Sequence, residues 1–93
     1  MRIYNYKSNQ TIVESKHWRA LLSYDVPQIV VINPRTPGLN PYDRPLVLVT
    51  NKKYSNTTSK HRNAYVNSLR AGSSTIIDAT PERIQEITGL ETR

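Results

Sequence analysis

The densest cluster of side chains that could do chemistry lies between Asn51 and Arg62. It reads Asn-Lys-Lys-Tyr-Ser-Asn-Thr-Thr-Ser-Lys-His-Arg, which joins ammonium groups, hydroxyls, a phenol and an imidazole. The free N–H groups and positive dipole end of a helix, together with hydroxyl donors and ammonium groups, form a site suited to phosphate. A structural interpretation is equally open, in which Thr57 or Thr58 caps a helix and the lysines are solvated.

The helix expected after this cluster has one polar face without an acid. Lys60, Asn63, Asn67 and Arg70 recur at i, i+3, i+7 and i+10. Such a face could lie along a phosphate backbone, with asparagine contacting base edges, although an ordinary exposed helix face has the same pattern. The stripe expected to pack inward consists of His61, Ala64, Tyr65, Ser68 and Leu69.

The positive charge is concentrated in one stretch of the chain. The formal net charge is +6, and no Asp or Glu occurs between Asp43 and Asp78. A field of one sign attracts polyanions, of which nucleic acid is the commonest in a cell, while a solubilising surface is the alternative. The residues predicted to bind nucleic acid or a partner are Arg44, Lys52, Lys53, Tyr54, Thr57, Thr58, Lys60, Arg62, Asn63, Asn67 and Arg70.

The composition argues against most enzymatic chemistry. The chain has no cysteine and only 2 histidines, which disfavours disulfides, thiol nucleophiles and zinc sites, and we expect no metal or cofactor. It has no Gly-rich phosphate loop, no carboxylate pair at useful spacing and no recognised nucleophile motif. We therefore expect a protein that is not an enzyme. The remaining catalytic hypothesis is a metal-independent ribonuclease that uses Lys53, Tyr54, His61 and Arg62.

Residues 1–93 are expected to form a single domain of the α+β class. A chain of 93 residues has room for one modest core, so a homodimer that buries more surface is an option. The order of elements predicts a mainly antiparallel β-sheet of about five to six short strands, with two helices packed on one face. The strands are expected at Ile3 to Tyr6, Thr11 to Val13, Ser15 to Tyr24, Gln28 to Ile32, Leu46 to Thr50 and Ser74 to Ile77.

The prediction also depends on an ambiguous stretch at residues 15–24, a proline-rich loop and the two helices. The stretch from Ser15 to Tyr24 also fits a helix, but a turn at Asp25-Val26-Pro27 before an apolar run favours a strand. Residues 33–45 hold four prolines and form a loop, long enough to be a binding element. Helices are expected from Ser55 to Gly72, and from Thr80 to Gly89 with Pro81 in the first turn.

Two segments resemble an uncharacterised family of small bacteriophage and mobile-element proteins. These are Ser23-Tyr24-Asp25-Val26-Pro27, where Val26 stands in place of the family's usual threonine, and Lys53-Tyr54-Ser55-Asn56-Thr57-Thr58-Ser59-Lys60-His61. The resemblance covers roughly residues 15–70 and implies a phage-encoded protein that acts in the host cytoplasm. The family supplies no activity and no site residues to carry over.

These observations lead to three hypotheses about function. The first is a non-enzymatic phage-encoded protein that binds nucleic acid, or a host nucleoprotein complex, through the basic strand-to-helix region. The second is an anti-defence inhibitor of the anti-CRISPR type that binds a host protein, and the third is the toxin-like ribonuclease. A cytoplasmic protein without membrane contact is expected, because no apolar run approaches the roughly 20 residues that span a bilayer.

Overall fold

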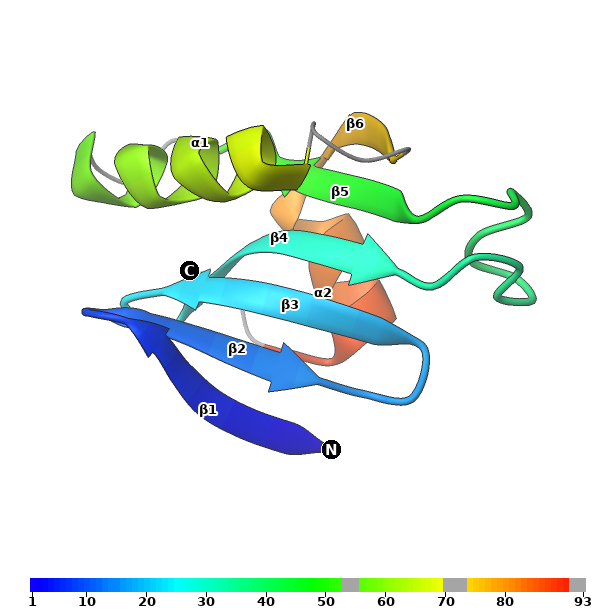
Figure 1. The fold of residues 1–93 in the computed structure, drawn as a ribbon, viewed down its shortest axis with the longest axis horizontal. Helices are drawn as coiled ribbons and strands as arrows, with labels where there is room; N and C mark the ends of the chain where they lie inside the picture. Colours follow the sequence, from blue (N-terminus) through cyan, green and yellow to red (C-terminus); the bar gives the residue numbers. More distant parts are fainter. Residues whose placement is uncertain (53–55, 70–73, 91–93) are drawn as a thin grey trace.

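A computed structural model describes residues 1–52, 56–69 and 74–90, which form one six-stranded sheet and two helices (Figure 1). The strands lie in the sheet in chain order. Neighbours from β1 to β5 are antiparallel, whereas β5 and β6 are parallel and α1 connects them. The elements are β1 (Arg2–Lys7), β2 (Gln10–Glu14), β3 (Trp18–Ser23), β4 (Val26–Ile32), β5 (Leu46–Thr50), α1 (Asn56–Leu69), β6 (Thr75–Ala79) and α2 (Pro81–Thr88). The predicted α+β class with a mainly antiparallel sheet is confirmed.

The prediction that both helices pack on one face of the sheet is wrong. Along β3, Leu21 belongs to an apolar cluster with Tyr65 of α1, whereas its neighbour Leu22 belongs to a cluster with Ile84 of α2. Successive side chains of a strand point to opposite faces, so the two helices cover opposite faces. In Figure 1, α2 accordingly lies behind β3 and β4. We call the face that packs against α1 the α1 side.

Strands β4 and β5 are sandwiched between the two helices, and this explains their composition. Every residue of β4 is buried, and four of the five residues of β5 are buried. Strands covered on both faces are apolar throughout instead of alternating with polar residues. Strand β1 lies at the edge of the sheet and has no buried residue, so one part of the α1 side remains open.

The segment from Ser15 to Tyr24 forms a strand, as favoured, but the turn after it lies earlier than predicted. Tyr24 and Asp25 form the turn, with φ of 50° and 65°, the positive values that a two-residue hairpin turn requires. Pro27 falls inside β4 opposite Leu22. Pairing of β4 with β5 begins only at Ile29, so the missing N–H of the proline interrupts no bond to β5.

Helix α1 differs from its predicted form at its start and along its buried stripe. It begins at Asn56, so Thr57 and Thr58 lie within its first turn and neither can be its cap. Tyr65 is buried as predicted, but Ala64 and Ser68 are exposed. Val66 is buried in their place, in the apolar cluster that also contains Val31 of β4 and Val47 of β5. The predicted end at Gly72 lies outside the described residues.

Helix α2 has the predicted termini. The Thr80 hydroxyl accepts a hydrogen bond from the Arg83 amide at 3.1 Å, and Pro81 follows at the first helical position. Gly89 ends the helix in the left-handed conformation with φ of 71°, and its amide bonds to the Gln85 carbonyl. None of the helices in the described residues is long and apolar enough to span a membrane.

The proline-rich loop at residues 33–45 is organised around one buried asparagine. The Asn40 side chain has no exposed surface, and its amide nitrogen lies 3.0–3.2 Å from the carbonyl oxygens of Ile32, Asn33 and Arg44. Its side-chain oxygen accepts a hydrogen bond from the Tyr42 amide at 3.0 Å. These contacts give the loop a fixed form at the end of the sheet opposite the start of α1 (Figure 1).

Candidate nucleic-acid interface

The predicted polar face of α1 is exposed in the structure. Lys60, Asn63 and Asn67 all lie at the surface, on the side of the helix that points away from the sheet. Arg62 has a different role, because its guanidinium lies 3.4 Å from the Thr50 carbonyl oxygen and 3.2 Å from that of Lys52. It donates to both carbonyls and so holds the end of β5 against the helix.

Thr58 and His61 belong to a polar cluster at the start of α1 and are not free ligands. The Ser23 hydroxyl is fully buried and lies 2.8 Å from Nδ1 of His61 and 3.2 Å from the Thr58 hydroxyl. The exposed Tyr24 ring stacks on His61, with 6.0 Å between ring centres and an interplanar angle of 24°. A serine without exposed surface cannot reach a substrate, so this cluster fixes the helix to the β3–β4 turn.

This cluster brings together two segments that lie far apart in the sequence. Ser23 and Tyr24 come from the first segment, and Thr58 and His61 come from the second. Their contacts join the β3–β4 turn to the start of α1. Of the four residues considered for ribonuclease chemistry, His61 and Arg62 have these structural partners, and Lys53 and Tyr54 lie outside the described residues.

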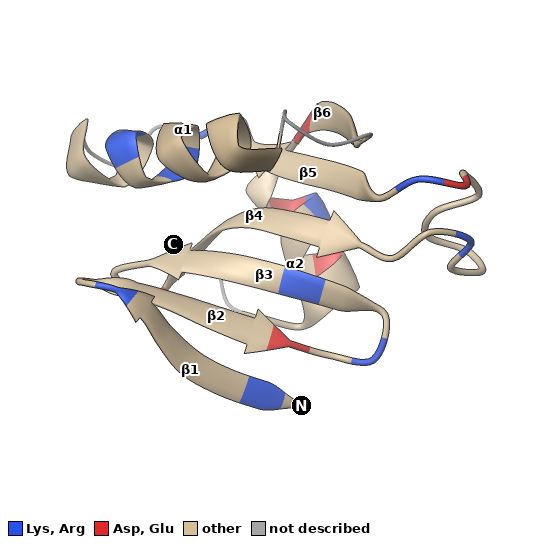
Figure 2. Ribbon diagram, viewed as in Figure 1, with Lys and Arg blue, Asp and Glu red and all other residues tan. Residues whose placement is uncertain are grey.

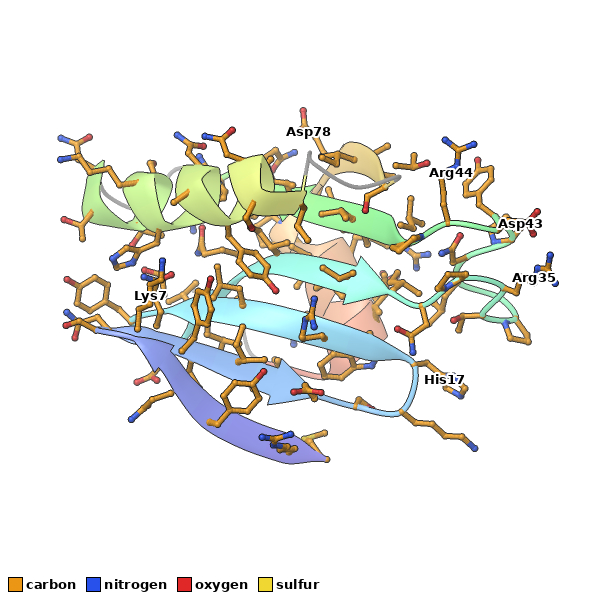
Figure 3. All side chains as sticks on the ribbon, in the orientation of Figure 1. Lys7, His17, Arg35, Asp43, Arg44 and Asp78 are labelled. Carbon is orange, nitrogen blue, oxygen red and sulfur yellow. The ribbon has the colours of Figure 1, made fainter. Side chains whose placement is uncertain are left out.

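The remaining predicted site residues are not gathered at one place. Lys52 and Thr57 are exposed near the start of α1. Arg44 lies in the proline-rich loop, whereas Lys7 lies at the opposite end of the sheet (Figure 3). Arg70 lies outside the described residues. The predicted basic region is thus split, because β5 separates Arg44 from the start of α1.

A second group of basic and aromatic residues, which the sequence analysis missed, lies on the uncovered part of the α1 side. We call this group the open face, and it consists of Arg2, Tyr4, Tyr6, Lys7 and Arg19. Tyr4 packs against the α1-side core, and the Tyr6 ring meets the Tyr65 ring of α1 edge to face, with 5.6 Å between centres. All five residues come from β1 and β3, far in sequence from the predicted site.

Cations lie against the tyrosines of the open face. The Arg2 guanidinium lies 4.7 Å from the centre of the Tyr4 ring, and the Lys7 ammonium lies 5.2 Å from the centre of the Tyr6 ring. Arg19 lies close enough to Tyr65 for its positive charge to lower the pKa of that phenol. Aromatic rings and positive charges are therefore interleaved on one surface.

The pKa values of Tyr4 and Tyr65 are both raised above the ordinary value of a tyrosine. The pKa of Tyr4 is raised above 10.0, first by a hydrogen bond to the Glu14 side chain and second by burial. Burial raises the pKa of Tyr65, and the nearby Arg19 charge acts in the opposite direction. The hydroxyls of Tyr4 and Tyr65 therefore remain neutral at neutral pH.

Charge is unevenly distributed between the two sides of the sheet. Basic residues lie on β1, β3 and α1, whereas α2 behind the sheet carries two acidic residues and one arginine (Figure 2). Among the described residues, the acids on the α1 side are Glu14, which bonds to Tyr4, and Asp78 at the β6 end. Asp78 lines a hollow of about 360 Å³ with Arg62 and Asn63, so the β6 flank of α1 is less suited to an anion than the β1 flank.

The pattern of β1 contains the signal that could have revealed the open face. Arg2, Tyr4 and Tyr6 alternate with Ile3 and Asn5, which is the period of a strand with two different faces. Placing these residues beside α1 also requires the sheet order, which the alternation does not supply.

The fold and this surface define a small α+β protein with one basic, tyrosine-bearing side. The chain matches no family model, no curated protein and no solved structure. Its function must therefore be inferred from its own residues and geometry.

Proposed function

We propose that this protein is a non-enzymatic nucleic-acid-binding protein whose interface is the α1 side. The interface combines the exposed polar face of α1 with the open face of β1 and β3. The observation that carries the proposal is the position of Arg2, Lys7 and Arg19, which lie on the same side of the sheet as Lys60 of α1. Segments separated in sequence thus contribute charges of one sign to one surface, as polyanion-binding surfaces require.

The exposure of these cations indicates that they are available to bind nucleic acid as well as to stabilise the fold. Arg2, Lys7, Arg19 and Lys60 are all exposed. Outside the interface, Arg35 lies 2.7 Å from Asp43, and Arg83 lies 3.2 Å from Glu86. Within the interface, Glu14 stands opposite both Arg2 and Arg19 in the strand register, so these two cations share one acid. The phage-encoded origin suggested by the two resembling segments is part of this proposal, as is action on nucleic acid or a nucleoprotein in the host cell.

The salt dependence of binding tests this function. We expect a labelled oligonucleotide to bind at low ionic strength, with log K falling linearly as log salt rises. Four phosphate contacts with a single strand predict a slope of about −3. Fluorescence anisotropy across a series of sodium chloride concentrations measures it, with DNA and RNA as separate probes.

Two results would count against the proposal. Binding with an affinity that barely changes with salt would mean that phosphate contacts do not drive it. Absence of binding to DNA and RNA at low salt would redirect the search to a host protein. The first surface to test would then be the loop around Asn40, which holds the half-exposed Tyr42 in a fixed position.

A further inference from the structure

We infer that the open face binds unpaired bases, so that the protein prefers single-stranded nucleic acid to duplex. This inference rests on the proposed function and narrows it to one class of nucleic acid. It also assigns a role to Tyr4 and Tyr6, which the phosphate contacts alone leave unexplained.

The first step is the accessibility of the rings. Tyr6 is 40 % exposed although its ring contacts Tyr65, so part of the ring surface remains available to a ligand. Tyr4 is half-buried beside it on the same strand. The register of β1 is irregular between Asn5 and Lys7, but the contacts of Tyr4 with the α1-side core and of Tyr6 with Tyr65 place both rings on the same face. Residues two apart in a strand are separated by roughly 7 Å. The two tyrosines therefore offer separate contacts for successive bases.

The second step is the placement of charge around the rings. Lys7 lies over Tyr6 and Arg2 lies over Tyr4, at the distances of cation–π contacts. In a complex these cations would move from the rings to the phosphates on either side of a stacked base. Interleaved aromatic and basic side chains on a sheet are the arrangement by which proteins hold single strands through base faces and backbone together.

The third step compares duplex nucleic acid, the alternative ligand, with a single strand. A duplex hides the faces of its bases within the stack, so the tyrosines could contact only its sugars and phosphates. Duplex would instead be recognised by the outward face of α1, where Lys60, Asn63 and Asn67 could enter a major groove. That face carries one lysine among its described residues, whereas the open face carries Arg2, Lys7 and Arg19 with Glu14 between the two arginines. The balance of charge therefore favours the open face.

A comparison of single-stranded and duplex probes tests the inference. Oligothymidylate, oligouridylate and a hairpin duplex of equal phosphate number would be titrated into the wild type, Tyr6→Leu and Tyr6→Phe. We expect both single strands to bind more tightly than the hairpin. Tyr6→Leu should weaken single-strand binding about 10-fold, since stacking contributes about 1–3 kcal/mol per base, whereas Tyr6→Phe should retain wild-type affinity.

The control and the possible outcomes separate this inference from the proposed function. Tyr42→Leu changes a tyrosine of the proline-rich loop that is 52 % exposed, and it should leave binding unchanged. Equal or tighter binding of the hairpin, with salt dependence intact and Tyr6→Leu silent, would overturn the base-stacking inference and leave the proposed function standing. No binding of any probe would overturn both. Circular dichroism and urea unfolding of each variant would show that the fold is retained.

Discussion

Removal of three cations from the α1 side is expected to abolish most nucleic-acid binding. In the triple variant Arg2→Gln/Arg19→Gln/Lys60→Gln, three phosphate contacts are lost while side-chain size is largely kept. At about 1 kcal/mol per exposed ionic contact, the affinity should fall about 100-fold near physiological salt. The slope of log K against log salt should become shallower by about 2, because each contact with a single strand contributes about 0.7. Anisotropy titrations at several salt concentrations measure both quantities.

A matched variant distinguishes local contacts from total charge. Lys16→Gln/Arg44→Gln/Arg83→Gln removes the same formal charge from the β2–β3 turn, the proline-rich loop and α2. We expect a loss of affinity below about threefold, since long-range effects of exposed charges are screened within about 10 Å at 0.1 M salt. Equal losses in the two variants would show that net charge matters and that the α1 side has no special role. The inclusion of Arg44 also tests the residue that the structure separates from the rest of the predicted site.

The largest expected effect on stability comes from Ile84→Ala in α2. Ile84 has no exposed surface and lies in the core cluster between α2 and the sheet. Truncation of a buried isoleucine to alanine costs about 2–5 kcal/mol, a large part of the roughly 5–15 kcal/mol that stabilises an ordinary domain. Urea denaturation followed by circular dichroism measures the change in the free energy of unfolding.

The same substitution on β6 provides the control. Ile77 is 46 % exposed, so Ile77→Ala should cost about 1 kcal/mol or less. Because α2 covers the face opposite the interface, folded Ile84→Ala protein should bind nucleic acid with wild-type affinity. A clear loss of affinity at equal folded fraction would show that α2 or the face beneath it takes part in binding. A loss of stability below 1 kcal/mol would contradict the assignment of Ile84 to the core.

The strands and the second helix could be predicted because their signals are local. The capping threonine, the first-turn proline and the terminal glycine of α2 each act through contacts within a few residues. The covering of both sheet faces is not a local property. Its signal was the unbroken apolar run from Ile29 to Ile32, which indicates burial on two faces, whereas one-sided packing would require alternation.

The candidate site could be predicted only in part, because part of it also depends on contacts between segments that are distant in sequence. Lys60, Asn63 and Asn67 share a surface because helical periodicity alone places them there. Arg62 looked equivalent to Lys60 in the sequence, but its side chain reaches the carbonyl of Thr50, which depends on how α1 crosses β5. The open face was missed because its residues come together only through the pairing of β1 with β2 and of β2 with β3.

Amide chemical-shift mapping tests most directly whether the α1 side binds nucleic acid. Oligothymidylate would be titrated into the ¹⁵N-labelled protein, which at 10.7 kDa suits such spectra. We predict that the largest shift changes fall on Arg2 to Lys7, on Arg19 and on α1, while α2 and the loop around Asn40 stay unchanged. Changes centred on α2 or on that loop, or no saturable changes, would contradict the proposed interface.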